Sequence, residues 1–265
     1  MELFFAKPGL QIAVVDDEAE FAVVAADKVT DLLKRKPAAI LGLPTGSTPE
    51  GLYAELAQRY RAGLVSFAAC KTFNLDEYIG LPAAHFGSYH TFMQKNLFSK
   101  INLPTGAAHL PSGDGVDPVT AAAQYEDLLV KWGPMDLMIL GIGTNGHIGF
   151  NEPGTPFDSK VHVTSLSAST IKSNSRFFGG ESAVPRQAVT MGIGDIVNSR
   201  EIMLLAKGES KAKAIAATVY GEVSPQVPAS VLQQHPAVLV VVDKAAASLL
   251  RRPDADVAGE GEAAV

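Results

Sequence analysis

Short apolar runs alternate along this chain with stretches in which apolar residues recur at helical spacing. The runs are too short for helices and are bounded by glycine, proline or polar residues, which is typical of buried strands. We therefore predict strands at Leu10–Val15, Ala38–Leu43, Lys71–Leu75, Asp136–Leu140, Glu201–Ala206 and Ala237–Val242.

Helices are predicted between these strands. The first is expected to begin with Asp17 as its N-cap and Glu20 as its capping-box partner, and to end before Pro37. Further helices are expected at Glu50–Arg61, Ser88–Ile101, Pro118–Trp132 and Ser210–Tyr220. This alternation predicts an α/β fold, a single domain over residues 1–252 with an open, mostly parallel sheet and helices on both faces.

Composition and charge narrow the class of protein. Hydrophobic residues make up 47% of the 265 residues and charged residues 19%, which excludes a chain that is disordered throughout. The net charge of −6 argues against nucleic acid as a partner, but it is compatible with a local basic pocket for a small anion. No apolar run is long enough to span a membrane, and the first residues lack the pattern of a signal peptide. The single cysteine, Cys70, fits a reducing compartment, so we expect a cytoplasmic protein. The tail, 253–265, is rich in small and acidic residues and is expected to be disordered.

Loops at the carboxyl ends of the strands are where an open α/β sheet binds its ligands. The loop Pro44–Glu50 carries the hydroxyls of Thr45, Ser47 and Thr48 together with Gly46, and it runs into a predicted helix. Its backbone N–H groups and the positive end of that helix would form a cradle for an anion. An ordinary turn in which Thr48 caps the helix, with a proline at the first helical position, explains the same residues equally well. The Gly-Lys-Ser/Thr element of a P-loop is missing.

Two adjacent acids, Asp76 and Glu77, follow the third predicted strand. They could serve as a base, as metal ligands or as helix caps. Because neighbouring side chains in a strand point to opposite faces, at most one of the two is expected to face a shared pocket. A solvated turn is the more common outcome for an acidic pair.

The loop Gly141–Gly154 holds the most candidate chemistry. Its first three glycines spell G-x-G-x-x-G, but more glycines and Pro153 follow, so no helix can begin cleanly and a dinucleotide site is disfavoured. The alternative is a glycine-walled pocket into which His147 and Glu152 project, with the carboxylate orienting and tuning the imidazole. A structural histidine in a tight loop is the simpler explanation. The two residues do not form an H-E-x-x-H pattern and no third ligand accompanies them, so no metal site is predicted.

Two basic residues, Arg176 and Lys211, are candidates for contacts with a dianionic ligand. Arginine contacts phosphate through paired N–H groups, and lysine acts as a point charge. Taken singly, each is more typical of a surface position.

Several segments together resemble the glucosamine-6-phosphate deaminase family. The resemblance extends in order from about Leu10 to Leu250, which makes a chance match negligible. It rests on LGLPTGSTP at 41–49, FNLDEYIG at 73–80, GIGTNGHIGFNEPG at 141–154, NSRFF at 174–178, TMGIG at 190–194 and Gly208–Lys211.

The resemblance implies a modified Rossmann-like fold and a reaction that needs neither cofactor nor metal. Glucosamine 6-phosphate and water would give fructose 6-phosphate and ammonia. Asp76 would move a proton from C2 to C1, His147 would act on the ring oxygen to open the sugar, and Glu152 would orient His147. A mobile lid at about 165–178 would cover the site. The residues implied to hold the phosphate are Thr45, Gly46, Ser47, Thr48, Arg176 and Lys211.

This chain departs from the family pattern in two places. Many members have aspartate two residues before the histidine, where this chain has Asn145, which we count among the catalytic residues. An asparagine supplies no charge, so His147 should be less basic than in those members. Members activated by N-acetylglucosamine 6-phosphate carry basic residues where this chain has His162 and Thr164, so no such activation is expected. A homo-oligomer is compatible with the resemblance, but a hexamer, which accompanies that activation, is not implied.

Three alternatives stay open. The related 6-phosphogluconolactonases carry a motif similar to GHTASLFPG, where this chain has GHIGFNEPG. A deaminase or isomerase for galactosamine 6-phosphate would share these motifs, because the reacting atoms are C1 and C2 and the epimers differ at C4. A sugar-phosphate-binding regulator of this fold would add a basic N-terminal DNA-binding module, which the sequence does not contain.

Overall fold

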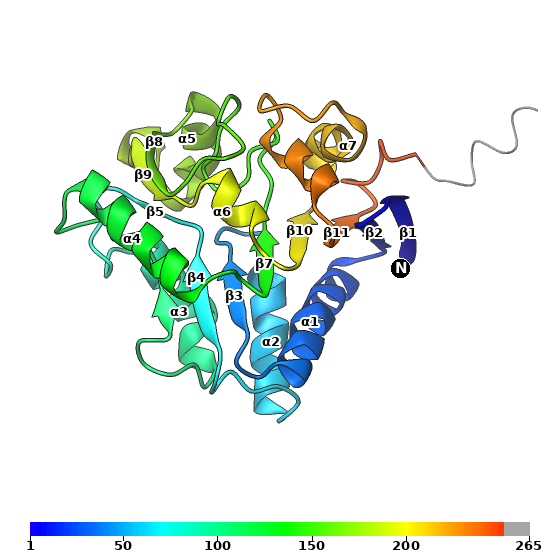
Figure 1. Ribbon diagram of the computed structural model, residues 1–265, viewed down its shortest axis with the longest axis horizontal. Helices are drawn as coiled ribbons and strands as arrows, with labels where there is room; N and C mark the ends of the chain where they lie inside the picture. The colour runs from blue at the N-terminus through cyan, green and yellow to red at the C-terminus, as the bar shows by residue number, and fades with distance from the viewer. Residues whose placement is uncertain (252–265) are drawn as a thin grey trace, which may run out of the picture.

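An eight-stranded sheet forms the centre of the computed structural model, which describes residues 1–251 (Figure 1). Neighbouring strands run parallel except for the pair β1 and β2 at one edge. In spatial order the strands are β1 (Glu2–Lys7), β2 (Leu10–Val15), β11 (Val238–Asp243), β10 (Ile202–Ala206), β7 (Leu137–Leu140), β3 (Ile40–Leu43), β4 (Lys71–Asn74) and β6 (Ala108–His109). The predicted open, mostly parallel sheet is confirmed, and each of the six predicted strands is present; the two outermost strands, β1 and β6, were not predicted.

Helices cover both faces of this sheet. One face packs against α1 (Glu18–Arg35), α2 (Glu50–Arg61) and α3 (Tyr89–Asn96). The other packs against α4 (Pro118–Trp132), α6 (Ile193–Val197) and α7 (Ala212–Tyr220). Successive residues of β7 enter the two cores in turn, as expected for a strand buried on both sides.

Two helix ends differ from their prediction. Asp17 caps α1 by accepting the N–H of Glu20 at 2.8 Å, but the Glu20 carboxylate accepts from the N–H of Asp16, one residue earlier than a capping box requires. The predicted helix Ser88–Ile101 is broken into α3 and a 3-10 turn, Phe98–Lys100. The break lies at Leu97, whose backbone leaves helical geometry while its side chain is buried in the same core as Met93.

A second, three-stranded antiparallel sheet lies near the carboxyl end of the main one. It consists of β5 (Asp76–Tyr78), β9 (Gln187–Thr190) and β8 (His162–Ser165). The helix α5 (Ala168–Asn174) and a 3-10 turn, Ser175–Phe177, follow β8, and Figure 1 groups them with this sheet. The sequence did not predict the small sheet, because its strands are short and pair over long distances along the chain.

The order of the main strands places a topological switch point between β3 and β7. From β3 the chain continues outward through β4 and β6, and from β7 it continues through β10 and β11 toward the other edge. Ligands of open α/β sheets bind beyond the strand ends at such a point. The loops that follow β3 and β7 are the two glycine-containing loops singled out from the sequence.

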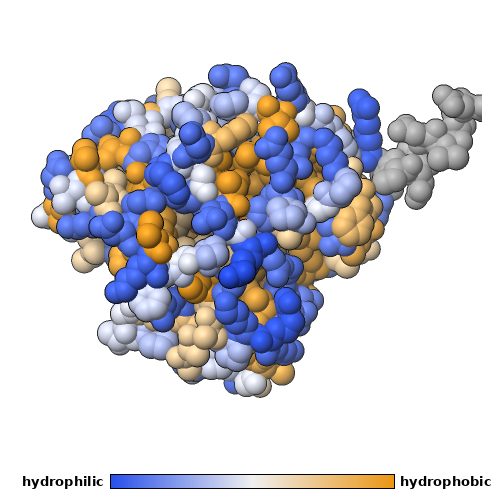
Figure 2. All heavy atoms as spheres, viewed as in Figure 1, coloured by the Kyte–Doolittle hydropathy of each residue, from blue (hydrophilic) through white to orange (hydrophobic). Residues whose placement is uncertain are grey.

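The surface is mixed in character. Figure 2 shows hydrophilic and apolar side chains interspersed over the face it draws. Within residues 1–251, no helix combines the length and the apolar character needed to cross a membrane. The predicted domain end at residue 252 and the predicted disordered tail, 253–265, lie outside the described residues.

Candidate active site

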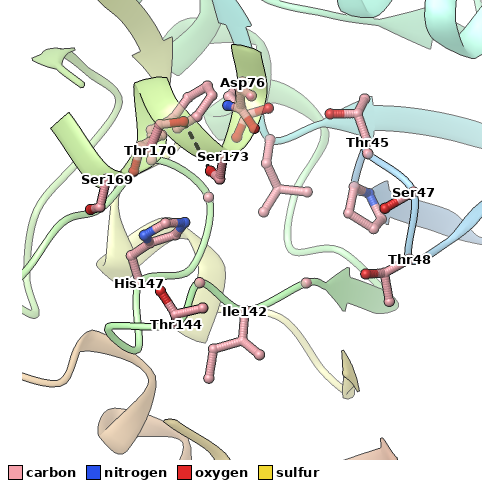
Figure 3. Close-up of a pocket in the computed structure, with 18 of the residues that line it drawn as sticks. Thr45, Ser47, Thr48, Asp76, Ile142, Thr144, His147, Ser169, Thr170 and Ser173 are labelled. Atoms are coloured by element: carbon pink, nitrogen blue, oxygen red, sulfur yellow. Dashed lines mark hydrogen bonds between the residues drawn. The ribbon is translucent and has the colours of Figure 1, made fainter. Parts of the chain in front are cut away.

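One pocket collects the loops predicted to carry chemistry. It is lined by the loop after β3, the start of β5, the loop after β7, the lid segment (residues 165–178) and Lys211. Figure 3 shows His147 on one side of this pocket, the hydroxyls of Thr45, Ser47 and Thr48 on the other, and Asp76 between them. Of the predicted site residues only Glu152 does not line this pocket; it lies behind His147.

Asp76 is the first residue of β5 and enters the pocket almost completely buried, with 8% of its surface exposed. Burial, helped by the charge of Glu77, raises the pKa of Asp76 to about 8. A carboxyl group with such a pKa can take up and release a proton near neutral pH. The buried environment, and not a special partner, therefore makes Asp76 a candidate base.

Glu77 points away from the pocket, as the alternation of side chains predicted. It is 1% exposed and accepts the backbone N–H groups of Tyr78, Tyr89 and His90, while the His90 ring lies 2.9 Å from its carboxylate. The idea that the acidic pair is a solvated turn is wrong. Glu77 instead fixes the beginning of α3 against β5, directly beside Asp76.

His147 packs tightly on the glycine loop. A Cβ atom at Gly143 would lie 2.2 Å from Cε1 of the His147 ring, so only glycine fits beneath it. Nδ1 of His147 lies 3.5 Å from Oε2 of Glu152. Asn145 donates its amide to the same Oε2 at 2.7 Å, and its Oδ1 accepts the backbone N–H of His147 at 3.3 Å. Asn145 therefore positions both partners by hydrogen bonds, a role that its lack of charge does not prevent.

The pKa of Glu152 is shifted in the opposite direction to the pKa of Asp76. Partial burial alone would raise it, but the His147 ring and the hydroxyl of Thr170 outweigh that effect and lower it to about 2. Glu152 is therefore ionised at neutral pH. An ionised carboxylate beside an imidazole orients the ring and stabilises its protonated form.

The opposite side of the pocket carries positively charged groups and hydrogen-bond donors. Ser47 Oγ accepts a hydrogen bond from Arg176 Nη2 at 3.0 Å, and Gly46 has a φ of 91°, a conformation that favours glycine. Lys211 Nζ donates to the carbonyl of Ile142 at 2.7 Å, and burial together with the charge of Arg176 lowers its pKa. Arg176, Lys211 and the loop that leads into α2 thus line the same pocket.

Thr48 does not cap α2, although that was an alternative explanation of the loop. The residue at the cap position is Pro49, and no side chain caps the helix. The prediction that this proline occupies the first helical position is therefore wrong by one residue. The uncapped N–H groups at this end stay available to a ligand in the pocket.

Sequence reasoning missed two residues that contact Glu152. Ser167 donates its hydroxyl to Oε1 of Glu152 at 2.8 Å, and Thr170 donates to the same atom. The only local signal was the S-x-x-T pattern of a helix start, which predicts capping and not a contact with a distant carboxylate. The tyrosine pair Tyr78 and Tyr89 was missed too; their hydroxyls lie 3.2 Å apart, and Asn174 of the lid segment donates to the former.

No metal centre is found in the part of the chain that the structure describes. Within residues 1–251, no group of three His, Cys, Asp or Glu side chains is arranged to hold an ion.

The chain matches known proteins over most of its length. The model of the family Glucosamine-6-phosphate isomerases/6-phosphogluconolactonase matches residues 16–241. Proteins named glucosamine-6-phosphate deaminase from Rhodopirellula baltica and Hahella chejuensis are each 48% identical, over 91% and 92% of this chain and 96% and 94% of their own.

Solved structures that resemble this chain include enzymes of the same two names. One described as a monomeric glucosamine-6-phosphate deaminase is 41% identical with a TM-score of 0.88, over 90% of this chain and 99% of its own. A 6-phosphogluconolactonase from Trypanosoma brucei, 20% identical with a TM-score of 0.76 over 92% of this chain and 99% of its own, shares the fold. As the resemblance of its motifs predicted, the chain belongs to the family of glucosamine-6-phosphate isomerases and 6-phosphogluconolactonases.

Proposed function

We propose that this protein is a glucosamine-6-phosphate deaminase, which converts glucosamine 6-phosphate and water to fructose 6-phosphate and ammonia. The observation that carries the proposal is the arrangement of one pocket, with His147 on one side, the anion loop (residues 45–48) on the other and Asp76 between them. A phosphorylated sugar would place its phosphate at the anion loop and its reacting carbons near Asp76 and His147. The names of the relatives agree with the activity that the sequence predicted.

Binding begins at the phosphate. The loop Thr45, Gly46, Ser47 and Thr48 would surround it with hydroxyl and backbone donors, and Arg176 and Lys211 would supply the charge. All six residues line the pocket. Arg176 now donates to Ser47, and the phosphate would share that donor. Contacts to a remote, unreactive group position the sugar for the steps at C1 and C2.

Ring opening follows at the other side of the pocket. His147 would donate a proton to the ring oxygen and recover one from the C1 hydroxyl, which breaks the bond between C1 and the ring oxygen and leaves an open-chain aldehyde. The ionised carboxylate of Glu152, 3.5 Å from Nδ1, would stabilise the imidazolium that donates this proton. Asn145, which donates to the same Oε2 atom, would hold the carboxylate in place.

Isomerisation and deamination would depend on Asp76. Its carboxylate would take the proton from C2, giving an enolamine, and return the proton to C1, giving an imine at C2. Addition of water to the imine and loss of ammonia then yield the ketose. One base with access to both carbons suffices, and its raised pKa suits both uptake and release of the proton.

The residues proposed to form the site all belong to a single chain. The neighbour described as a monomeric enzyme agrees with that reading. Closure of the lid segment over the pocket would exclude water until the imine forms.

Release of ammonia from glucosamine 6-phosphate, with fructose 6-phosphate followed in a coupled assay, tests the proposal. Galactosamine 6-phosphate and 6-phosphogluconolactone serve as parallel substrates. Equal amounts of ammonia and fructose 6-phosphate are expected from the gluco substrate. Turnover of the galacto epimer alone would change the substrate, and turnover of the lactone alone would overturn the reaction. Binding without turnover of any substrate would favour a regulator.

A further inference from the structure

The carboxylate of Glu152 connects two separate parts of the molecule. Its Oε2 atom receives the amide of Asn145 and lies beside His147, both in the loop after β7. Its Oε1 atom receives the hydroxyls of Ser167 and Thr170, both in the lid segment. Each oxygen therefore serves one side, and the orientation of the carboxylate depends on both.

These two hydroxyls also organise the start of α5. Ser167 is the N-cap, and its Oγ accepts the backbone N–H of Thr170 at 3.2 Å. Thr170 is 3% exposed, so its hydroxyl is shielded from water. A buried hydroxyl donating to an ionised carboxylate forms a stronger bond than a neutral pair does. The first turn of α5 is thus attached to Glu152.

The far end of the lid segment is attached to the opposite side of the pocket. Arg176 donates to Ser47 in the anion loop, and Asn174 donates to the hydroxyl of Tyr78 at 2.8 Å. The lid segment therefore spans the pocket from Glu152, beside His147, to the loop that carries Ser47.

We propose that Thr170 and Ser167 are positioning residues that align Glu152 with His147 only while the lid segment lies over the pocket. The proposal rests on the proposed deaminase function. When the segment lifts, Oε1 loses both donors and the carboxylate is free to rotate away from Nδ1. When Arg176 captures the phosphate, the segment returns and the general acid is assembled. Binding at one end of the substrate thereby prepares the chemistry at the other.

The chain offers a conservative variant and a matched control. Thr170→Val keeps the shape of the side chain and removes the donor, whereas Thr170→Ser keeps the donor. Ser175→Ala removes a hydroxyl from the same segment, but this hydroxyl donates to the carbonyl of Lys172 and does not reach Glu152. A general loosening of the segment would affect the valine and alanine variants alike.

The kinetic test compares these variants with glucosamine 6-phosphate. Thr170→Val should lower kcat about tenfold, the loss expected for one hydrogen bond to a charged group, with a smaller change in KM. Thr170→Ser and Ser175→Ala should stay within about twofold of the wild type, as expected where no such bond is lost. Equal losses of kcat in Thr170→Val and Ser175→Ala would overturn the proposal.

A second test needs no deaminase activity. Trypsin cleavage after Lys172 and Arg176, both exposed, reports opening of the lid segment and is followed by mass spectrometry of the released peptides. Thr170→Val should raise the cleavage rate about tenfold in wild-type background, because an attaching bond is lost, and should change it little in Glu152→Ala. The same increase in both backgrounds would show that Thr170 does not act through Glu152.

The two tests separate this inference from the proposed function. If the wild-type chain releases no ammonia from glucosamine 6-phosphate, the proposed function fails while the trypsin result still decides whether Glu152 holds the segment. If ammonia is released but the cleavage rates of Thr170→Val and wild type agree, the attachment fails and the deaminase function stands. Thermal melting of each variant controls for unfolding, and Thr170→Ser shows whether the fold tolerates substitution at this position.

Discussion

Asp76 lines the pocket and Glu152 lies behind His147, and the surroundings of these two carboxylates give them opposite proton affinities. Within residues 1–251, no hydrogen-bond donor is found on the Asp76 carboxylate, and burial raises its pKa to about 8. Glu152 accepts three side-chain donors and lies beside His147, and its pKa is lowered to about 2. The comparison shows that deep burial without donors raises the pKa of a carboxyl group, whereas donors and a neighbouring imidazole outweigh partial burial and lower it.

The two elements that carry these residues explain the difference. Asp76 begins β5, where the neighbouring Glu77 takes the N–H groups that start α3 and leaves none for Asp76. Glu152 follows a glycine-rich loop and meets the first turn of α5, whose hydroxyls point at it. Among the described residues, the Asp76 carboxylate therefore lacks hydrogen-bond donors, whereas the Glu152 carboxylate receives several.

Removing the proposed base should have the largest effect. Asp76→Asn should lower kcat about a thousandfold, because Asp76 is the only carboxylate among the described residues that line the pocket. The coupled ammonia and fructose 6-phosphate assay measures it, and binding of substrate to the variant controls for folding. Activity within tenfold of the wild type would show that Asp76 is not the base.

Displacing His147 without changing it should have a smaller but substantial effect. Gly143→Ala would place a Cβ 2.2 Å from the His147 ring and force the ring out of its present position beside Glu152. We expect a loss of kcat of about a hundredfold, the scale of one misplaced acid–base group. Gly141→Ala is the matched control, because a Cβ there meets nothing within 4 Å. Equal activities of the two variants would contradict the role of the tight packing.

Neutralising the fixed charge should cost less than removing the base. Glu152→Gln keeps the size of the side chain but loses the charge that stabilises a protonated His147. We expect kcat to fall about tenfold, the scale of one charge-assisted contact. Steady-state kinetics at pH 7 measure the loss. A loss as large as that of Asp76→Asn would mean that the roles of the two carboxylates are not distinct.

The buried carboxyl of Asp76 should make the stability of the fold depend on pH. The pKa of Asp76 is raised in the folded state, so the folded protein holds a proton that the unfolded chain releases, and stability falls as the pH rises from about 4 to about 8. Asp76→Asn removes this penalty and should be more stable than wild type at pH 9 by a few kcal/mol, with a smaller difference at pH 5. Urea unfolding at both pH values measures it. A variant that is less stable than wild type at pH 9 would contradict the burial argument.

Much of this architecture follows from local sequence. The apolar runs predict β2, β3, β7, β10 and β11 because a strand buried on both faces has to be apolar throughout. The small sheet cannot be predicted in the same way, since β5 reads Asp-Glu-Tyr and pairs with Thr190 and its neighbours more than a hundred residues away.

In the candidate site, too, local features can be predicted from the sequence, whereas long-range contacts cannot. The loops at Ser47 and His147 can be recognised from the sequence because each lies at a strand end and each carries its chemistry within a few residues. The contact of Thr170 with Glu152 depends on where α5 folds over the pocket, and the role of Glu77 depends on the position of α3. Both are products of tertiary structure.

The most direct test of the contrast between the two carboxylates is a carbon-13 NMR titration of the side-chain carboxyl groups. The Asp76→Asn and Glu152→Gln variants assign the two signals. The structure predicts one carboxyl that titrates near pH 8 and is lost in Asp76→Asn, and one that stays ionised to the lowest pH at which the fold persists and is lost in Glu152→Gln. Titration of both groups near pH 4, as in an exposed carboxylate, would contradict the assignment of Asp76 as a buried base and of Glu152 as a fixed charge.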